Sequence, residues 1–509
     1  MGRLARRDFL RLAAASAFAP PAPARAADRP GPRATDVHRA TRNTWYGPPA
    51  LGSLFTERPP PAKPYPGAPR VPLPAGDALG ATSLAEAAHG PAPAPAFSGA
   101  PIPLGVLAAL LKLTNGVTGV IPGSEPPELR RAAPSAGALY AGELYVVAER
   151  VDGLAPGVYS YAVAEHALVS IRSGRSLEVV ARAVEAPEAV AGAACAVLLS
   201  NVFHRYAWRY GARGYRYALV DSGHIGENLR LAVAAARLAH AMLPRFEDDA
   251  LNALLGIDGQ QEAVCALHAV GARAEARGGA PSRALVEKGS APPALAEVER
   301  YHEATKLVAG AAAGPAPASA ALEVAAPAGT LRLAAAPPPA LPLTRAIQQR
   351  RSARGFREEP IPQQALAFAL ELARSPGLSV RLVVHRVAGL APGLYDAAAG
   401  GGALAEVRRG DFAERLVRAC LFQEKAGSAA VAFTWLADLG ASAPAGERRY
   451  RDQLVAAGAA AERVYLAAES LGLAARNLAA FFDDSLADLL GLAGRERVVV
   501  HLTLLGPES

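Results

Sequence analysis

One compact cluster suited to phosphate binding is Arg350-Arg351-Ser352-Ala353-Arg354, directly after a predicted helix over residues 343–349. Three guanidinium groups and a hydroxyl so close together can grip a phosphate, because each planar guanidinium can donate two hydrogen bonds to neighbouring oxygens. The alternative interpretation is a solvated helix end, where arginine is favoured by the helix dipole. Since arginine is abundant throughout this chain, composition alone favours the helix end.

A second candidate is the segment R-R-A-A-P-S-A-G-A-L-Y at 130–140, just before a predicted strand. Pro134 restricts the backbone, and Ser135, Ala136 and Gly137 are small enough for backbone amides and carbonyls to approach a flat ring closely. Taken alone, the segment has the composition of an ordinary loop. Neither cluster identifies a ligand until its place in the fold is known.

The elements that must position these clusters occur twice along the chain. Four passages recur in the same order, and three of the four pairs are separated by about 235 residues. A repeat of that length indicates a duplicated domain rather than a solenoid. The paired passages are 37–42 with 301–306, 144–161 with 380–397, 212–238 with 447–473, and 247–259 with 483–494.

Each copy is predicted to be an α+β domain. A helix precedes a strand pair whose Ala-Pro-Gly connection suits a tight reverse turn. A buried strand, a long helix, a short helix and a final strand follow. The long helix is apolar on nearly all sides, so we expect it to be central, with His224 near its start as a capping or packing residue. The main elements are expected at 105–113, 194–199, 223–239 and 263–270, and again at 363–373, 429–434, 458–471 and 497–505.

The flanking segments complete the predicted organisation. Residues 1–27 read as an export signal of the Tat type, since Arg6-Arg7 precedes a short apolar stretch and a small-residue cleavage site. Its proline-rich end disfavours the alternative of an amphipathic first helix, and its apolar part is too short to span a bilayer. We therefore expect a periplasmic or otherwise exported protein that uses the Tat machinery and does not insert stably in the membrane. The predicted divisions are a signal at 1–27, a Pro-rich extension at 28–77, domains at 78–275 and 341–509, and an Ala/Pro-rich linker at 276–340.

Composition bears on two other classes of function. The formal net charge is +7, but the cations are dispersed in ones and twos rather than in long runs, so we predict no nucleic-acid binding. Cys195, Cys265 and Cys420 each lie in an apolar run without paired spacing. That pattern predicts buried structural thiols, with neither disulfides nor a metal site.

Taken together and in their order, these passages resemble the nitroreductase superfamily and, within it, the SagB/ThcOx-type dehydrogenases. The resemblance covers most of 35–275 and, more faintly, 300–507. It implies an α+β fold, noncovalently bound FMN, and sites formed where two domains meet. The motifs that carry it are A-P-S-A-G-A-L-Y-x-x-E-L-Y-V-V at 133–147, G-L-A-P-G-V-Y at 153–159, Y-G-x-R-G-Y-R-Y-A-L-x-D-x-G-H-x-x-x-N-L at 210–229, and R-R-S-x-R at 350–354.

The two copies depart from the family pattern in complementary ways. In the family, the R-R-S-x-R element grips the FMN phosphate and one side of the ring, and the P-S loop comes from the partner domain. The first copy has A-H-G-P-A-P at 88–93 where the arginines belong, and the second has the short R-S-P-G-L at 374–378 in place of the loop. The resemblance therefore implies an intramolecular pseudo-dimer with one composite FMN site. Its predicted cofactor-binding residues are Pro134, Ser135, Ala136, Gly137, Arg350, Arg351, Ser352 and Arg354.

The subfamily places a Lys-Tyr pair, proposed as catalytic, where this chain has Arg209-Tyr210. A guanidinium stays protonated in proteins, so Arg209 is unsuited to act as a general base, while Tyr210 can donate a proton or position a substrate. The alternative is that Arg209, Arg213, Tyr215 and Tyr217 form a structural Arg–Tyr network.

We predict an FMN-dependent oxidoreductase that transfers a hydride between flavin N5 and an organic small molecule or peptide. The alternative is an exported flavin- or partner-binding protein that has lost catalysis. The sequence leaves open whether chains associate further.

Overall fold

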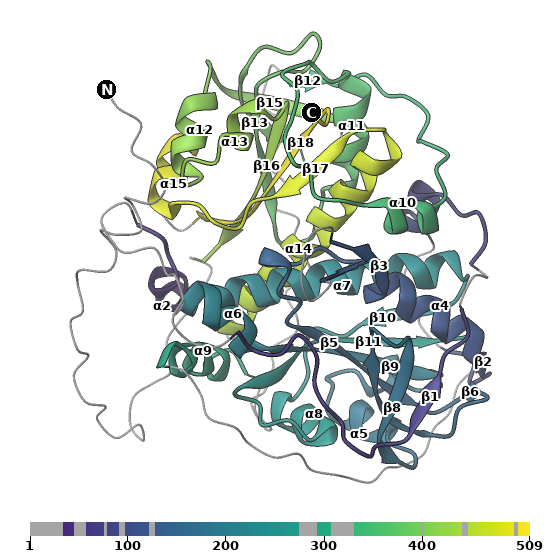
Figure 1. Cartoon of the computed structure of the whole chain (residues 1–509). Helices are drawn as coiled ribbons and strands as arrows, with labels where there is room; N and C mark the ends of the chain where they lie inside the picture. The colour runs from purple at the N-terminus through teal and green to yellow at the C-terminus, as the bar shows by residue number, and fades with distance from the viewer. Residues whose placement is uncertain are drawn as a thin grey trace.

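The computed structural model describes residues 34–44, 58–75, 79–90, 97–121, 128–273, 293–306, 330–398, 402–439, 446–492 and 497–509. These segments form two lobes, with the first copy below and the second above in Figure 1, and a long helix of each copy lies at the seam between them. The predicted export signal lies outside the described residues.

The lower lobe contains a seven-stranded sheet of order β1-β8-β7-β5-β9-β11-β10. All neighbouring strands are antiparallel. The central strands are apolar and buried on both faces along almost their whole length, which explains why they read as continuous hydrophobic runs. The strands are β1 (Arg70–Pro72), β5 (Gly142–Ala148), β7 (Gly157–Ala162), β8 (Ala167–Ser173), β9 (Cys195–Val202), β10 (Ala239–Met242) and β11 (Glu262–Gly271).

The upper lobe repeats this sheet strand for strand, in the order β12-β15-β14-β13-β16-β18-β17. Its neighbouring strands are again all antiparallel. The matching topologies confirm the predicted duplication of an α+β domain. The strands are β12 (Leu331–Arg332), β13 (Ser379–Val384), β14 (Gly393–Ala397), β15 (Ala403–Arg409), β16 (Val431–Asp438), β17 (Ala474–Asn477) and β18 (Arg497–Gly506).

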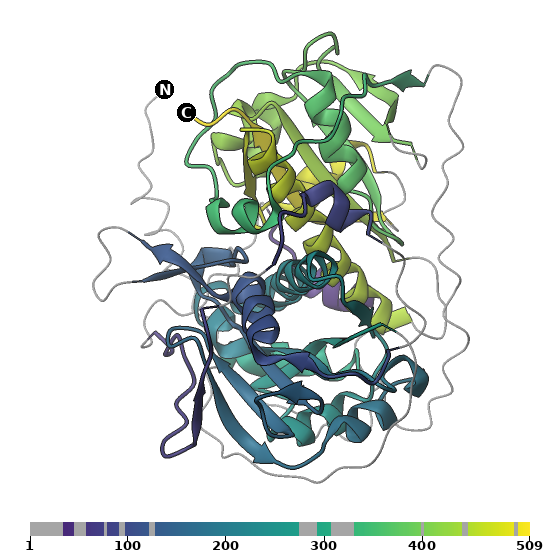
Figure 2. The same ribbon diagram turned by 90° about the vertical axis from the view of Figure 1, so that its right-hand side faces the viewer.

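Two short strand pairs and the helices complete the lobes. The β3–β4 hairpin (Val117–Val120 and Leu129–Arg131) projects beside the seam in Figure 2, and β2 (Ile102–Pro103) pairs with β6 (Val151–Asp152). The lower helices are α3 (Leu84–Ala88), α4 (Leu104–Asn115), α5 (Leu177–Arg182), α6 (Phe203–Tyr210), α7 (Gly214–Ala235) and α8 (Asp248–Leu255). The upper ones are α10 (Leu343–Gln349), α11 (Gln363–Leu372), α12 (Ala413–Ala419), α13 (Lys425–Ser428), α14 (Gly446–Ser470) and α15 (Asp483–Leu490).

The two long helices, α7 and α14, cross at the centre of the molecule with their backbones in contact. A Cβ added to Gly223 would lie 2.0 Å from the carbonyl oxygen of Val455, and one added to Gly458 would lie 1.9 Å from that of Val220. Only glycine permits such an approach. The crossing point therefore marks a pseudo-twofold axis that relates the two copies.

Both central helices begin earlier than predicted, at Gly214 and Gly446 rather than at residues 223 and 458. The extra turns carry arginine and tyrosine, and apolar periodicity does not detect a helix whose polar side chains are buried by contacts with another domain. His224 consequently lies inside α7 rather than at its start, and packs beside His501 and Asn477 of the second copy.

The start of each long helix is clamped to the opposite lobe by buried ion pairs. Arg213 and Arg216 both contact the carboxylate of Asp483 on α15, with nitrogen–oxygen distances of 2.6 Å. The second copy repeats this arrangement with Arg448 and Arg451, whose distances to Asp248 on α8 are 2.5 Å. For Arg213 the contacts agree with the structural alternative, although Asp483 of the other copy is a partner besides Tyr217.

Two short helices outside the predicted domains brace the same clamps. On α2 (Ala34–Ala40), His38 contacts the Tyr450 hydroxyl at 2.9 Å, and Thr41, which follows the helix, accepts a hydrogen bond from Arg216. On α9 (Pro293–Glu303), His302 packs against the ring of Tyr215, whose hydroxyl lies 3.0 Å from the Thr305 side chain. The predicted extension and linker therefore contribute to the core and, through β1 and β12, to both sheets. The composition did not reveal this contribution, because α2 and α9 are short helices, of 7 and 11 residues, within segments rich in proline.

The three cysteines are free and buried, which confirms their predicted structural role. Burial raises the pKa of Cys195 and of Cys420 to about 12, so neither forms a thiolate at neutral pH.

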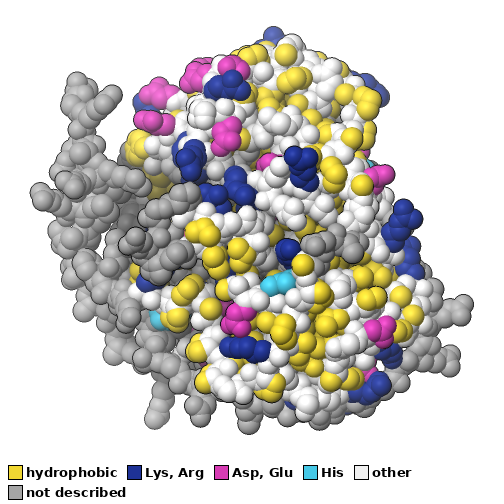
Figure 3. Space-filling view, turned by 45° about the vertical axis from the view of Figure 1, so that its right-hand side comes forward, with side chains coloured by type: hydrophobic (Ala, Val, Ile, Leu, Met, Phe, Trp, Pro, Cys, Tyr) yellow, Lys and Arg dark blue, Asp and Glu magenta, His cyan; other side chains and the backbone are white. Residues whose placement is uncertain are grey.

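The surface shows basic side chains in small separate groups on the face drawn in Figure 3, interrupted by acidic, apolar and uncharged atoms. Among the helices that the structure describes, none is long and apolar enough to cross a bilayer.

Candidate functional site at the seam

The loop after β4 carries an unusual concentration of left-handed backbone. Gly137, Ala138 and Tyr140 have φ values of 63°, 54° and 47°. For residues other than glycine this conformation is unfavourable, and strained backbone of this kind clusters at ligand-binding and active sites. We call residues 134–137 the P-S-A-G loop. A side chain at Gly137 would also collide with Tyr210, since a Cβ there would lie 2.3 Å from the phenolic oxygen.

A chain of hydrogen bonds runs from this loop into the interior. The Ser135 hydroxyl lies 2.8 Å from that of Tyr206 and accepts a hydrogen bond from the Tyr140 amide. Tyr206 in turn donates to the carboxylate of Asp221, which also accepts from the Ala136 amide at 3.3 Å. Ser135 is half-buried, whereas Tyr206 and Asp221 are buried, so the chain connects the loop surface with the core.

The R-R-S cluster (residues 350–354) meets the same loop region from the other copy. Arg350 follows the C-terminal end of α10, and its buried guanidinium donates to the carbonyl oxygens of Ala132, at 3.0 Å, and Arg131, at 3.3 Å. Its charge also lies 5.3 Å from the ring centre of Tyr465. The structure therefore brings the two predicted halves together through Arg350.

The other members of the cluster point to different partners. Arg351 donates to the carbonyl oxygens of Gln348, at 2.9 Å, and Thr118, at 3.4 Å. The Ser352 hydroxyl lies 2.8 Å from that of Tyr465. Arg354 is exposed, and its backbone amide donates to the Glu508 carboxylate. The guanidinium groups of Arg350 and Arg351 thus donate to different backbone carbonyls in this conformation.

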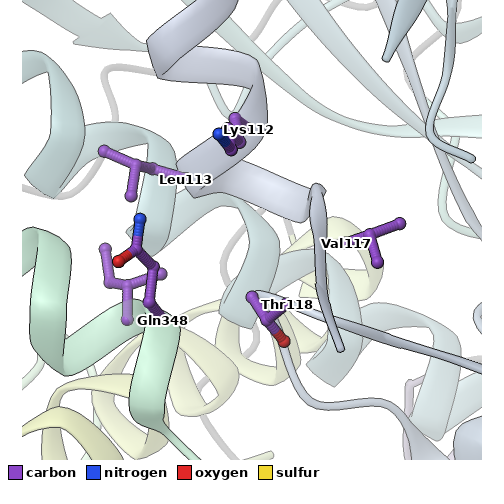
Figure 4. Close-up of a pocket in the computed structure, with 6 residues that line it drawn as sticks. Lys112, Leu113, Val117, Thr118 and Gln348 are labelled. Carbon is purple, nitrogen blue, oxygen red and sulfur yellow. The ribbon is translucent and has the colours of Figure 1, made fainter. Parts of the chain in front are cut away.

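A cavity of about 240 Å³ lies beside this cluster, where the two copies meet (Figure 4). Its walls come from the end of α4, from β3 and from α10. The residues that line it are Lys112, Leu113, Val117, Thr118, Ile347 and Gln348.

The predicted catalytic pair lies at the end of α6, against the P-S-A-G loop. Tyr210 packs edge-on against Tyr217, with ring centres 4.9 Å apart, while Arg209 is exposed and lies beside the Tyr210 ring. Burial raises the pKa of Tyr210 to about 12, against the opposing charge of Arg209. Tyr210 is consequently a hydrogen-bond donor at neutral pH rather than a base.

Two carboxyl groups near the seam, both missed at the sequence level, have strongly raised pKa values. Burial raises the pKa of Asp221 to about 7, although the hydrogen bond from Tyr206 and the nearby Ser135 hydroxyl oppose the shift. Burial likewise raises the pKa of Glu462 to about 8, against the charge of Arg350. Asp221 is the aspartate of the A-L-x-D-x-G-H motif, so its place in that motif could have indicated it as a functional residue.

The comparisons with known proteins agree with this architecture. The family model described as "Nitroreductase family" matches residues 96–272 and 347–506, one segment in each lobe. The crystal structure of a provisionally assigned nitroreductase from Anabaena variabilis is 25% identical, with a TM-score of 0.75 over 94% of this chain and 99% of that one. A provisionally assigned nitroreductase of Methanocaldococcus jannaschii is 30% identical over 127 residues, which span 25% of this chain and 64% of that protein. The chain therefore belongs to the nitroreductase family, a membership that supports oxidoreductase activity.

Proposed function

We propose that this protein is an FMN-dependent oxidoreductase that holds one flavin per chain, between the P-S-A-G loop of the first copy and the R-R-S cluster of the second. The observation that carries the proposal is the contact of Arg350 with the carbonyl oxygens of Arg131 and Ala132, because it joins the two halves across the seam. The strained backbone at Ala138 and Tyr140, directly after the loop, supports a ligand-binding role on this side.

The donor groups around this position suit an anionic, flat cofactor. Arg131 Nη1 and Arg476 Nε are buried and have no hydrogen-bond partner among the residues that the structure describes. Arg476 contacts the cluster through the Ala353 carbonyl. Unused cationic donors of this kind favour a phosphate. Following the family resemblance, Arg351, Ser352 and Arg354 would hold the phosphate and residues 134–137 the ring. When bound, FMN would supply hydride transfer at its N5 atom.

The pseudo-symmetric position on the other side of the seam supports a single flavin. There Arg463 donates to the carbonyl oxygens of Leu372 and Arg374, each at 2.7 Å. His89 stands where the family has arginine, and it faces Glu371 at 3.3 Å. We call this region the opposite site. In this region Arg463 donates its hydrogen bonds to backbone carbonyls. The opposite site lacks both the P-S loop and the arginine cluster.

The proposed substrate is an organic small molecule or peptide, as the SagB-type resemblance suggests. Tyr210 would position it by donating a hydrogen bond, and Arg209 would contribute charge but no base. We further propose that the Tat machinery exports the folded protein to the periplasm, on the basis of residues 1–27.

A flavin- or partner-binding protein without catalysis is the second candidate. It is favoured by arginine at the position of the expected base, and by the seam cavity of about 240 Å³, which falls below the roughly 300–1,000 Å³ typical of ligand pockets. A protein that binds FMN but exchanges no hydride with any of a panel of reduced and oxidised organic compounds would support this candidate.

The test is reconstitution of the purified chain with FMN, followed by measurement of flavin per chain. We expect one flavin; a colourless protein would contradict the proposal, and two flavins would contradict the single site.

Arg351→Ala should weaken FMN binding roughly 10- to 100-fold, because a charge-assisted phosphate contact is lost. Arg345→Ala is the matched control, since Arg345 is an exposed arginine on α10, the helix that precedes the cluster. Equal affinities of the two variants would count against the assigned phosphate site.

A further inference from the structure

The hydrogen-bond chain from Ser135 to Asp221 has a direction. Because the Tyr206 hydroxyl donates to Asp221, its oxygen is left to accept from Ser135. The Ser135 oxygen accepts from the Tyr140 amide and keeps a further lone pair at the half-buried surface of the loop. A proton that arrives at Ser135 can therefore pass inward to Asp221. Each hydroxyl gives up one proton and receives one, so both end with a single proton.

Within the described residues, this hydrogen-bond chain occurs in the first copy and has no counterpart in the second. The two central helices align at a constant offset in sequence. In this alignment, Ala456 of α14 is the equivalent of Asp221 of α7. The ion-pair clamps, in contrast, are present in both copies. A network needed to hold the lobes together would be expected twice, whereas this one lies only beside the P-S-A-G loop.

Asp221 lies in surroundings that allow it to change protonation state. The ionisable groups that face it are the phenols of Tyr206 and Tyr210 on α6, and the carboxyl of Glu462 on α14. The Ser135 hydroxyl and the Ala136 amide complete its contacts. Its partners are therefore neutral donors, in contrast to Asp483 and Asp248, which each contact two guanidinium groups.

We propose that Asp221 is the proton acceptor of the composite site and acts through Tyr206 and Ser135. This inference rests on the proposed flavin chemistry. When a substrate loses a hydride to the oxidised flavin, its remaining acidic proton passes to the Ser135 oxygen. The Ser135 proton moves to Tyr206, and the Tyr206 proton moves to the Asp221 carboxylate. The substrate would thus lose one hydride to bound FMN and one proton to the relay, and Asp221 would become neutral. Asp221 supplies the basic function that Arg209 lacks, and it is a positioning residue because it does not touch the substrate.

The first test needs no flavin. Infrared difference spectra of the full chain between pH 6 and 8 should contain a carboxylic-acid carbonyl band that disappears as pH rises, with a midpoint near 7. Asp221→Asn should remove this band. Tyr206→Phe should keep it and move its midpoint upward, because a hydrogen bond to the ionised form is lost. Glu462→Gln, Asp452→Asn and Glu469→Gln identify the bands of the three other described carboxyls with raised pKa values. An unchanged band in Asp221→Asn would overturn the proposal.

The second test uses FMN alone as the probe. Photoreduction of bound FMN in weakly buffered solution at pH 7 should take up more protons in the wild type than in Asp221→Asn, by up to about half a proton per flavin, because added negative charge raises the pKa of a nearby carboxyl. Asp221→Ala, which copies Ala456, should behave like Asp221→Asn. Equal uptake in wild type and variants would overturn the relay. If the wild type binds no FMN, the proposed function fails, while the infrared result still reports on the carboxyl.

Discussion

The two sides of the seam differ most clearly in a pair of pseudo-equivalent glutamates, Glu227 on α7 and Glu462 on α14. Burial acts to raise the pKa of Glu227, but Arg463, at 3.0 Å, and Arg230, at 2.7 Å, outweigh it and lower the pKa. Glu462 faces His224 at 3.5 Å, and its pKa is raised to about 8. Glu227 is thus held charged on one side of the seam, whereas its equivalent, Glu462, can become neutral on the other.

This difference separates two kinds of feature: those that stabilise the fold, and those that serve a site on one side of the seam. The arginine–aspartate clamps and the glycine crossing occur in both copies, as expected of structural devices. Arg463, which fills the opposite site, and Asp221, which underlies the composite site, each occur once. Duplication therefore provides an internal control within one chain, and the following changes test it.

The clamps should have the largest effect, and it should be equal on both sides. Asp483→Ala and Asp248→Ala each leave two buried guanidinium groups without their carboxylate, so each should lower the free energy of unfolding by about 3–5 kcal/mol. Denaturant unfolding checks this. The controls are Asp484→Ala and Asp249→Ala, whose more exposed ion pairs should contribute less than about 1 kcal/mol. A large effect on one side only would show that the clamps are not equivalent.

The glycine crossing should tolerate no side chain. Gly458→Ala and Gly223→Ala each place a methyl group against a carbonyl oxygen of the other helix, so each should lower the free energy of unfolding by about 3 kcal/mol through forced separation of the helices. The matched control is Gly105→Ala at the start of α4, where the nearest atom to an added Cβ is 3.9 Å away. Loss of stability in the control alone would contradict the assigned axis.

The sequence predicted the duplication, the α+β order of elements and the two halves of the composite site, because repeats, turns and apolar runs are local signals. It did not predict the early start of α7 and α14, since Arg216 and Arg451 are buried only by partners far along the chain. Nor did it indicate Asp221 as a titrating group, because a raised pKa depends on burial that only the folded structure provides. The hydrogen bonds of Arg351 to the carbonyl oxygens of Gln348 and Thr118 also depend on the tertiary fold, so the sequence could not indicate them.

Acid should weaken the clamps only at a pH well below the one at which Asp221 of the composite site becomes protonated, since the pKa of Asp221 is about 7. In both Asp483 and Asp248, burial acts to raise the pKa, but the paired arginines outweigh it and hold the pKa at about 2. An unfolded aspartate titrates near 3.9, so this stabilisation is present above about pH 4 and is lost as pH falls towards 2. Each carboxylate should contribute on the order of 2 kcal/mol. Unfolding free energies between pH 6 and 2 measure the loss, and the slope should flatten in Asp483→Ala.

The smallest expected effect concerns the opposite site. Arg463→Ala removes two hydrogen bonds to backbone carbonyls but leaves Glu227 paired with Arg230, so the free energy of unfolding should fall by only about 1–2 kcal/mol. The pKa of Glu227 should rise, because one of its two cations is gone. Flavin content should stay at one per chain, since the opposite site lacks both the P-S loop and the arginine cluster. A second flavin in this variant would mean that Arg463 alone blocks the opposite site, and that the loss of the two motifs matters less than the bulk and charge of one side chain.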